Sequence, residues 1–442
     1  KAELGADLCA KIEAWAAALA TKPVLVANKA AAPKSLTNVW VQQGATGDGS
    51  SPDRATASLL DAYNKVAENG TIHVIGTVPV NSADVIAGLN KTVTIQSATG
   101  ATGVLKRNSG NAETLITIAA NGNLTIKNVA IDGGAMYNGG VVSRAGATTP
   151  PCGVYTQTSG KGQLIWVLPN GSFTLGDKGV LCNNAIVGAS YTIGNAFHFG
   201  SAIYTEGNVT IEPGSEITGN LVSGYAADGA AISNITSTGT ITINGGKIHN
   251  NYGERLGSAI RVSNGKLNIY GGEIVKNLMP ATKQGSNAEP AGAIYVDNTA
   301  LNIKGNVTIS GNEVANLNLA NANQVINVTG SLTGGDVYLS ALGRMNAGGE
   351  LGTIADGTLG VKKIQRDVTT DKPVSTSATK SGNKLIWDNE TVIYVGANGK
   401  DTDNGTKASP FKTLKKAYET VADGGTIHVI GTVPVNEGIT VA

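Results

Sequence analysis

Hydrophobic and polar residues alternate over short stretches in the middle of the chain. In the segment KLNIYGGEIVKN, Leu267 and Ile269 alternate with polar neighbours, Gly271 and Gly272 turn the chain, and Ile274 begins a new alternation. A period of two over about four to eight residues predicts a β-strand, because a helix would repeat every three or four residues. Glycine pairs supply the positive φ angles that tight corners need. The pattern therefore predicts short strands joined at glycine corners.

The same unit recurs about every 28 residues. The constant part of each unit, from an Ala-Ile pair to an I-x-x-N motif, spans 17 to 19 residues, while the segment before the next Ala-Ile varies from 7 to 15 residues. Three short strands in each unit, stacked on the same strands of the next unit about 4.8 Å away, predict a parallel β-helix with loops on one face. The Ala-Ile pairs end at Ile203, Ile232, Ile260 and Ile294.

The asparagine of each I-x-x-N motif falls at one corner of the predicted coil. An inward asparagine can donate and accept hydrogen bonds along the stack and can satisfy the amides of a turn. We therefore expect a structural ladder at this corner rather than a ligand site. Its members are Asn220, Asn251, Asn277 and Asn312.

Twelve residues, GTIHVIGTVPVN, occur twice without change, at 70–81 and at 425–436. Each copy follows a short strand, a turn and a helix, so the second copy predicts the start of another β-helix. We therefore expect the chain to be a fragment of a longer repeat protein. Leu4, Leu8, Ile12, Trp15 and Leu19 follow a helical period and predict an amphipathic helix. The expected parts are a helical N-terminal segment at 1–37, the β-helix at 38–360, a strand-containing connector at 361–390 and the capping start of a second β-helix at 391–442.

Residues 394–417, YVGANGKDTDNGTKASPFKTLKKA, combine a strand, a Gly/Asp turn and a PFxTLxxA helix. This segment resembles the motif that caps the first coil in right-handed parallel β-helix proteins of the pectin-lyase-like superfamily. In the earlier copy Leu59 and Ala62 match Leu414 and Ala417, but Pro52 comes three places early and the phenylalanine is lost. The repeated units are similar to those of large bacterial surface proteins and adhesins of that superfamily.

The resemblance covers residues 38–340 and 391–442, and it implies an all-β fold, a right-handed parallel β-helix solenoid. It leaves the function open, because the superfamily includes lyases, hydrolases, phage tailspikes and non-catalytic adhesins.

Composition and charge exclude several classes of function. The 442 residues include 59 glycines and only 13 prolines, which argues against collagen and against a proline-rich linker. A net charge of +1 is too small for a nucleic-acid partner held through its phosphates or for a polybasic membrane anchor. No run of about 18 apolar residues is present, so we expect no membrane span.

Candidate catalytic residues are sparse. Hydrolysis of a glycosidic bond needs two carboxyl groups, and a lyase needs a base together with charge stabilisation. The sequence has no Asp-Asp pair, and its four histidines lack metal-ligand spacing. We therefore predict no catalytic residue, no metal and no cofactor, although residues from different coils can still converge. Asp401 is expected to form an Asx turn rather than a calcium site.

The three cysteines leave the redox state of the thiols open. Cys152 and Cys182 lie 30 residues apart, close to one unit, but they precede different parts of the repeat and should occupy different corners. A disulfide between them is therefore not expected.

If the isoleucine of each Ala-Ile pair points inward, the residue after it points outward. This rule places Tyr204, Ser233, Arg261 and Tyr295 in one column on an outer face. Aromatic and arginine side chains are frequent anchors of binding sites, so Tyr204, Arg261 and Tyr295 are candidate contacts for a glycan or a surface protein. A solvated face with ordinary packing between coils is the alternative.

These observations favour a secreted or cell-surface bacterial adhesin or stalk module without catalysis, in which a stiff solenoid presents loops such as 278–292. One alternative is an extracellular fibre subunit that associates head to tail, because exposed strand edges accept further strands. Another is a polysaccharide lyase or glycoside hydrolase of the same superfamily. The sequence names no ligand.

Overall fold

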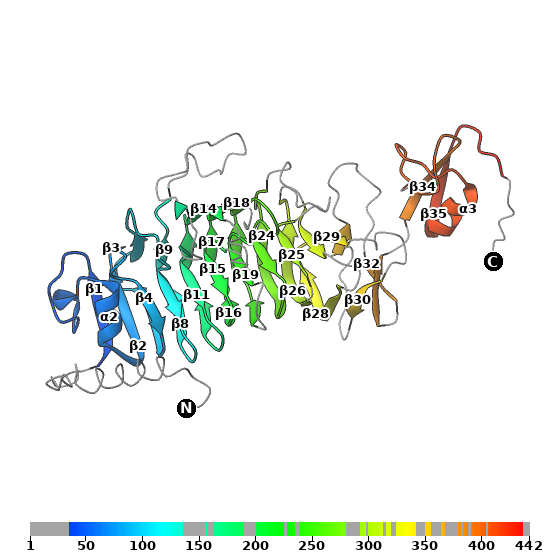
Figure 1. Cartoon of the computed structure of the whole chain (residues 1–442). Coiled ribbons are helices and arrows are strands. Elements are labelled where there is room, and N and C mark those ends of the chain that lie inside the picture. The colour runs from blue at the N-terminus through cyan, green and yellow to red at the C-terminus, as the bar shows by residue number, and fades with distance from the viewer. Residues whose placement is uncertain are drawn as a thin grey trace, which may run out of the picture. The chain divides into compact units, whose positions relative to one another are not determined.

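The described residues form an all-β solenoid, as the sequence predicts (Figure 1). Parallel strands from successive coils lie side by side, and the coils follow one another in chain order. The expected N-terminal helix, and residues 280–291 of the expected loop at 278–292, lie outside the described residues. The computed structural model describes residues 35–135, 155–156, 162–189, 200–224, 228–234, 239–279, 292–297, 299–312, 315–319, 324–341, 350–354, 364–366, 378–381, 383–387, 390–403 and 405–435.

Each coil contributes strands to three main columns, and pairing within a column is parallel. The first column contains β4 (Ile86–Leu89), β7 (Ile116–Ile118), β11 (Ile165–Val167), β15 (Ile203–Thr205), β19 (Ile232–Asn234), β23 (Ile260–Val262), β25 (Ile294–Val296), β27 (Leu317–Leu319), β29 (Val337–Ala341) and β31 (Ile364–Arg366). The second contains β1 (Leu36–Gln42), β2 (Val66–Ile75), β5 (Thr92–Ser97), β8 (Asn123–Lys127), β12 (Ser172–Leu175), β16 (Asn208–Ile211), β20 (Thr240–Ile243), the first parts of β24 (Lys266–Val275) and β26 (Ala300–Ser310), β28 (Ile326–Gly334) and β30 (Glu350–Ile354).

The third column contains β3 (Thr77–Val80), β6 (Val104–Arg107), β9 (Ala130–Asp132), β13 (Val180–Cys182), β17 (Glu216–Thr218), β21 (Lys247–His249) and the second parts of β24, β26 and β28. Strand β29 also reaches this column, because Val337 lies opposite Ile309. A separate small sheet follows the asparagine corner and contains β10 (Tyr155–Thr156), β14 (Ala185–Ala189), β18 (Leu221–Gly224) and β22 (Tyr252–Gly253).

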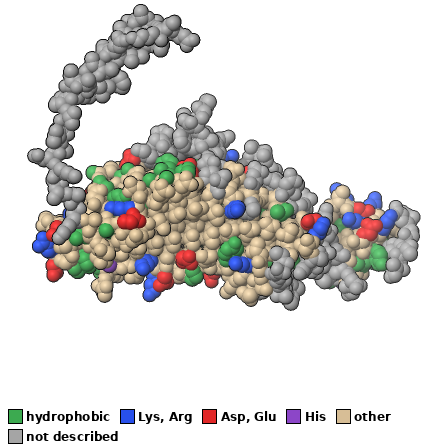
Figure 2. All heavy atoms as spheres, turned by 90° about the horizontal axis from the view of Figure 1, so that it is seen from below, with side chains coloured by type: hydrophobic (Ala, Val, Ile, Leu, Met, Phe, Trp, Pro, Cys, Tyr) green, Lys and Arg blue, Asp and Glu red, His purple; other side chains and the backbone are tan. Residues whose placement is uncertain are grey.

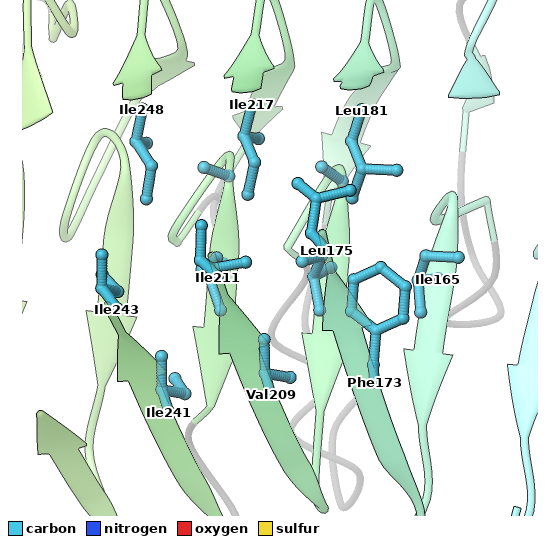
Figure 3. Close-up of a cluster of buried hydrophobic side chains, with 14 of the residues drawn as sticks. Ile165, Phe173, Leu175, Leu181, Val209, Ile211, Ile217, Ile241, Ile243 and Ile248 are labelled. Atoms are coloured by element: carbon cyan, nitrogen blue, oxygen red, sulfur yellow. The ribbon is translucent and has the colours of Figure 1, made fainter. Parts of the chain in front are cut away.

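The core is a continuous column of aliphatic side chains. In β12, Phe173 and Leu175 are buried, whereas Ser172 and Thr174, which alternate with them, are partly exposed. Figure 3 shows apolar side chains from successive coils pointing into the same interior. Because each fully buried aliphatic side chain contributes about 1.5–3 kcal/mol, stacking of many small coils compensates for the scarcity of aromatic residues.

The ladder asparagines are turned inward by a left-handed residue that precedes each of them. A left-handed φ costs an ordinary L-residue about 1–2 kcal/mol, while glycine, and to a lesser degree asparagine, adopt it readily. These preceding residues are Gly219 (φ 65°), Asn250 (φ 53°), Lys276 (φ 55°) and Gly311 (φ 62°). Each corner therefore consists of a left-handed residue followed by an inward asparagine. The I-x-x-N motif specifies only the asparagine.

Hydrogen bonds join the asparagines into a ladder along the stack. The Oδ1 atom of Asn251 accepts from the backbone N–H and the Nδ2 group of Asn220, at 3.1 and 3.0 Å. Asn277 accepts in the same way from Asn251, and Asn312 accepts from Asn277. Upstream, the backbone N–H of Asn184 donates to Asn220 at 3.1 Å. The ladder thus satisfies polar groups that the corner would otherwise bury without partners.

Arg107 ends the ladder at its upstream side. Its guanidinium is almost fully buried, and its Nε group donates to Oδ1 of Asn184 at 3.2 Å. Its other nitrogens donate to four backbone carbonyls, those of Asn111, Glu113, Gly162 and Gln163. The arginine therefore supplies the donors that a further asparagine would have provided.

A helical cap covers the first coil. Helix α2 (Leu59–Lys65) begins after Ser58, whose side chain accepts a hydrogen bond from the backbone N–H of Asp61 at 3.2 Å. Leu59 and Ala62 are buried and belong to the core cluster of the solenoid. We call residues 36–80, which also include the short helix η1 (Pro52–Arg54), the first cap.

The parallel pairing continues to β31, which ends at Arg366 and so passes the expected boundary at 360. In the connector, β32 (Ala378–Ser381) and β33 (Lys384–Trp387) pair antiparallel, and β33 also pairs antiparallel with β30. Residues 390–435 form a second cap with β34 (Glu390–Gly396), α3 (Leu414–Thr420) and β35 (Val421–Ile430). Its own small core contains Ile393, Val395, Phe411 and Ala417. Among the described residues, no helix has the length and apolar character needed to cross a membrane.

Candidate functional site

A groove of about 520 Å³ crosses the outer side of the third column of strands. Its wall is formed by residues at equivalent positions in successive coils, because Glu216 lies opposite Lys247, and Lys247 opposite Glu273. The groove is lined by Gly214, Ser215, Glu216, Gly246, Lys247, His249, Gly272, Glu273, Asn306 and Thr308. Its volume is within the usual range of ligand pockets, but its lining is polar, which favours a ligand rich in hydrogen-bonding groups.

Corner glycines keep one side of the groove free of side chains. Gly246 has a φ of +80°, and a Cβ atom there would lie 2.6 Å from Oγ of Ser215. Gly272 has a φ of +96°, and its Cβ would lie 2.7 Å from the carbonyl oxygen of Gly246. Glycine is therefore required at these corners by both conformation and space.

The charged residues of the groove form two pairs between neighbouring coils. Nζ of Lys247 lies 3.2 Å from Oε2 of Glu273, and these side chains are about half exposed. Nε2 of His249 is hydrogen-bonded to Oε1 of Glu216. Nδ1 of the same imidazole lies 2.9 Å from Nδ2 of Asn250, which can only donate, so the hydrogen-bond network assigns the proton of the neutral ring to Nε2. The ionisable side chains that line the groove are thus two carboxylates, one ammonium and one imidazole.

The predicted outer column is present in the expected register. Tyr204 lies opposite Ser233, Ser233 opposite Arg261, and Arg261 opposite Tyr295. The column is less exposed to solvent than the sequence analysis expects, because Ser233 is fully buried and Arg261 is only 7% exposed. Pointing away from the core of a coil does not guarantee contact with solvent.

Contacts between neighbouring coils engage most of the column. The guanidinium of Arg261 lies 4.4 Å from the ring centroid of Tyr295, and its Nη2 group lies 3.4 Å from Asp297. The ring of Tyr204 packs edge-on against Trp166 at 5.7 Å. The Nε and Nη1 groups of Arg261 are buried and have no hydrogen-bond partner in the structure. The column is therefore held largely by packing between coils, and Arg261 leaves two buried donors unpaired.

The remaining candidate residues have structural surroundings. Oδ1 of Asp401 accepts hydrogen bonds from the backbone N–H groups of Lys412 and Thr413, at 3.0 and 2.8 Å, so this carboxylate fixes the start of α3. No cluster of three or more metal-ligating side chains occurs in the part of the chain that the structure describes. Cys182 is a free thiol, and burial, followed by the nearby carboxylates of Asp132 and Glu216, raises its pKa to about 12. Cys152 lies outside the described residues.

Comparisons with protein-family models, with curated proteins and with solved structures find no match for this chain. Figure 2 shows one face of the molecule, on which acidic and basic side chains are scattered among small polar groups and do not form a patch of one sign.

The groove residues were not identified from the sequence. Glu216 and Glu273 are 57 positions apart, and only the register of the stack places them in one wall. A signal was nevertheless present, because each precedes the isoleucine of an I-x-x-N motif, as Lys247 does. Alternation makes that position outward, so the motif that predicts the ladder also marks the wall of the groove.

Proposed function

We propose that this protein is a ligand-binding module of a bacterial extracellular or cell-surface protein, of the adhesin or stalk type, without catalysis. The observation that carries the proposal is the polar groove across the third column of strands, with Glu216, Lys247 and Glu273 in one wall. A stack of hydrogen-bonded coils with one continuous core suits a stiff spacer, and the groove supplies a surface for recognition.

The charges of the groove favour a neutral or amino-sugar glycan. Two carboxylates accept hydrogen bonds from hydroxyl or ammonium groups, and Lys247 donates to hydroxyl oxygens. Two carboxylates beside a single lysine disfavour polyuronates, which are the usual substrates of polysaccharide lyases. A lyase would also need cations beside the substrate carboxylate, and the groove offers a single lysine, which is paired with Glu273.

A glycoside hydrolase is the second candidate, and the placement of Glu216 and Glu273 favours it. The two residues are separated by two coil spacings, about 10 Å, which is close to the carboxyl separation of about 6.5–9.5 Å in inverting glycosidases. Against catalysis, each carboxylate is engaged by a neighbouring His249 or Lys247. Hydrolysis needs one carboxyl group that donates a proton to the leaving oxygen.

The fold-level analogy adds support of a weaker kind. Cap and repeated units resemble the pectin-lyase-like superfamily and its adhesins, but a shared fold does not transfer a function. The analogy agrees with an extracellular location and leaves the ligand to be determined by experiment.

A glycan array with two matched variants tests the binding proposal. Glu273→Lys reverses the charge of a half-exposed groove residue that pairs with Lys247, and Glu350→Lys makes the same change at a half-exposed residue that pairs with Lys384 outside the groove. We expect binding of neutral or amino-sugar glycans to fall at least 10-fold in Glu273→Lys and to persist in Glu350→Lys. No bound glycan, or equal loss in both variants, would contradict the proposal.

Release of new reducing ends from neutral polysaccharides separates the two candidates. The binding module should release none. Turnover that is abolished by Glu273→Gln or Glu216→Gln would establish the hydrolase instead.

A further inference from the structure

The outer side of the second column carries a regular array of small polar residues. In each of the successive strands β5, β8, β12, β16 and β20, the second residue is buried in the core, and the first and third residues point outward. These outward residues are seven threonines, two asparagines and one serine, in the pairs Thr92–Thr94, Asn123–Thr125, Ser172–Thr174, Asn208–Thr210 and Thr240–Thr242. We call these ten residues the threonine array. None of them is ionisable or aromatic, and Lys127 and Lys266 mark two of its edges.

The array follows the strand register without interruption. Its central row consists of residues that lie opposite one another in successive coils, namely Thr94, Thr125, Thr174, Thr210 and Thr242. The pairings of this row contain no bulge, whereas the pairings β1–β2 and β24–β26, outside it, are shifted. Neighbouring parallel strands lie about 4.8 Å apart, and alternate residues of one strand lie about 6.6 Å apart. The array is therefore a two-dimensional lattice of hydrogen-bonding groups.

The outward positions of the other two columns do not share this chemistry. They include Trp166 and Arg261 in the first column, and Lys106 and Asp132 in the third. Strand propensity would accept valine, isoleucine or tyrosine at an outward position as readily as threonine. The requirements of the fold therefore leave the uniform composition of the array unexplained.

The hydroxyl groups of the central row are open to a partner. Thr94, Thr125, Thr174 and Thr210 are partly exposed, and within the residues that the structure describes their hydroxyl groups make no hydrogen bond. Threonine is β-branched and has few rotamers, so each residue presents a hydroxyl and a methyl group at positions that are fixed before binding. At the end of the row, Oγ1 of Thr242 accepts from Nδ2 of Asn268 at 3.2 Å.

We propose that the threonine array binds ice. The array lacks ionisable side chains, so it offers no counter-charge to a charged partner and is complementary to an uncharged one. The partner must also be a solid lattice, because the hydroxyl and methyl groups repeat in two directions over five coils. Ice meets both requirements, since its oxygen atoms repeat at distances close to the spacing of the strands and to that of alternate residues.

Selectivity for ice over liquid water follows from the rigidity of the array. A water molecule of the lattice can donate to or accept from a threonine hydroxyl, and the methyl groups occupy the spaces between lattice waters. One hydrogen bond contributes only about 0.5–1.5 kcal/mol, but a preorganised array makes many contacts with an ordered surface at once. Liquid water lacks this order. The activity is separate from ligand binding in the groove, because the groove lies on the third column.

Ice shaping and thermal hysteresis of the full chain, measured in a nanolitre osmometer, test the proposal. We expect faceted ice crystals and a freezing point below the melting point. Thr125→Tyr with Thr210→Tyr places two protruding rings in the array while tyrosine keeps the preference for a strand, so we expect both effects to be lost. The control, Thr117→Tyr with Thr218→Tyr, makes the same change at partly exposed strand threonines of the first and third columns and should retain both effects.

Partitioning of protein labelled at its N-terminus into a growing ice hemisphere gives an independent measurement. We expect the unchanged chain and the control to enter the ice, and the array variant to stay in the liquid. Thermal melts followed by circular dichroism show whether each variant folds. If the tyrosine variant does not fold, Thr125→Ser with Thr210→Ser replaces it, because this variant removes only two methyl groups and should shape ice more weakly than the unchanged chain.

Absence of ice shaping by the unchanged chain would overturn the proposal, as would equal loss in the array and control variants. Sedimentation with crystalline cellulose tests a polysaccharide lattice as the alternative partner. Binding to cellulose that the array variant loses, in a protein that does not shape ice, would also overturn the proposal.

Discussion

Replacement of Asn251 by alanine tests whether the ladder stabilises the solenoid. The side chain is fully buried and makes five hydrogen bonds. Its Oδ1 atom accepts two from Asn220, and its Nδ2 group donates to the carbonyls of Ile217 and His249 and to Oδ1 of Asn277. Alanine removes all five and adds no partner.

The expected loss can be worked out from these bonds. The backbone N–H of Asn220 is left buried without its acceptor, which costs about 2 kcal/mol, within the range of about 1–3 kcal/mol for an orphaned group. The other four bonds contribute about 0.5 kcal/mol each when both partners retain other contacts. We therefore expect Asn251→Ala to lower the free energy of unfolding by about 4 kcal/mol, measured by urea denaturation followed by circular dichroism.

A second asparagine ladder on the outer side of the second column provides the control. Nδ2 of Asn302 donates to Asn268 at 2.8 Å, and its Oδ1 accepts from Asn327 at 3.1 Å. Asn302 is partly exposed, so water replaces the lost partners, and Asn302→Ala should cost about 1 kcal/mol. Equal losses in the two variants would refute the claim that burial makes the inner ladder stabilising.

The aspartate variant Asn251→Asp separates shape from hydrogen bonding. It keeps the shape of the side chain but presents an oxygen to three acceptors, so a buried charge is left without donors on that side. We expect a larger loss than for alanine at neutral pH. Part of it should be recovered as the pH falls, because the protonated carboxyl group can donate one bond.

Three further predictions concern separate features of the fold. Lys276→Gly relieves a left-handed φ of 55° and should raise the free energy of unfolding by about 1 kcal/mol. Lys247→Gly, on the adjacent strand, should not raise it. A lower free energy of unfolding in Lys276→Gly would contradict the claim that Lys276 is strained. Burial lowers the pKa of His73, so below about pH 6.5 the unfolded state binds more protons than the folded state. The free energy of unfolding should therefore fall as the pH is lowered through this range. The fall should be smaller in His73→Gln than in the unchanged chain. A raised thiol pKa of about 12 should leave Cys182 unmodified by iodoacetamide at pH 8 in the folded protein, and peptide mapping that finds rapid alkylation before unfolding would contradict this.

The strands and the ladder were accessible from the sequence because both depend on local spacing. Leu267 and Ile269 alternate with polar residues at a period of two, and Asn251 belongs to a set of asparagines that follow the Ala-Ile pairs at nearly constant spacing. Their positions in these repeats are enough to place them inside the coil. The confirmed solenoid follows from these patterns. The left-handed position before each asparagine was less visible, since it is filled by residues as different as Gly219 and Lys276.

The groove required the three-dimensional register. Its wall combines Glu216, Lys247 and Glu273 from three coils, and loop lengths between coils vary, so sequence distance does not show that they are neighbours. The solvent exposure of a residue is also difficult to predict from the sequence. Alternation placed Arg261 correctly in its column, but its exposure of 7% depends on packing around the strand, which alternation does not describe.

Different positions of one motif determine the fold and line the candidate site. In E-I-x-x-N and K-I-x-x-N the isoleucine enters the core and the asparagine joins the ladder, so either substitution disturbs the neighbouring coils. The residue before the isoleucine is about half exposed in Lys247 and Glu273 and contributes to neither. A change there alters the charge of one step of the groove while the ladder and the core stay intact. If the groove binds a ligand as proposed, its preference can therefore vary coil by coil without loss of stability.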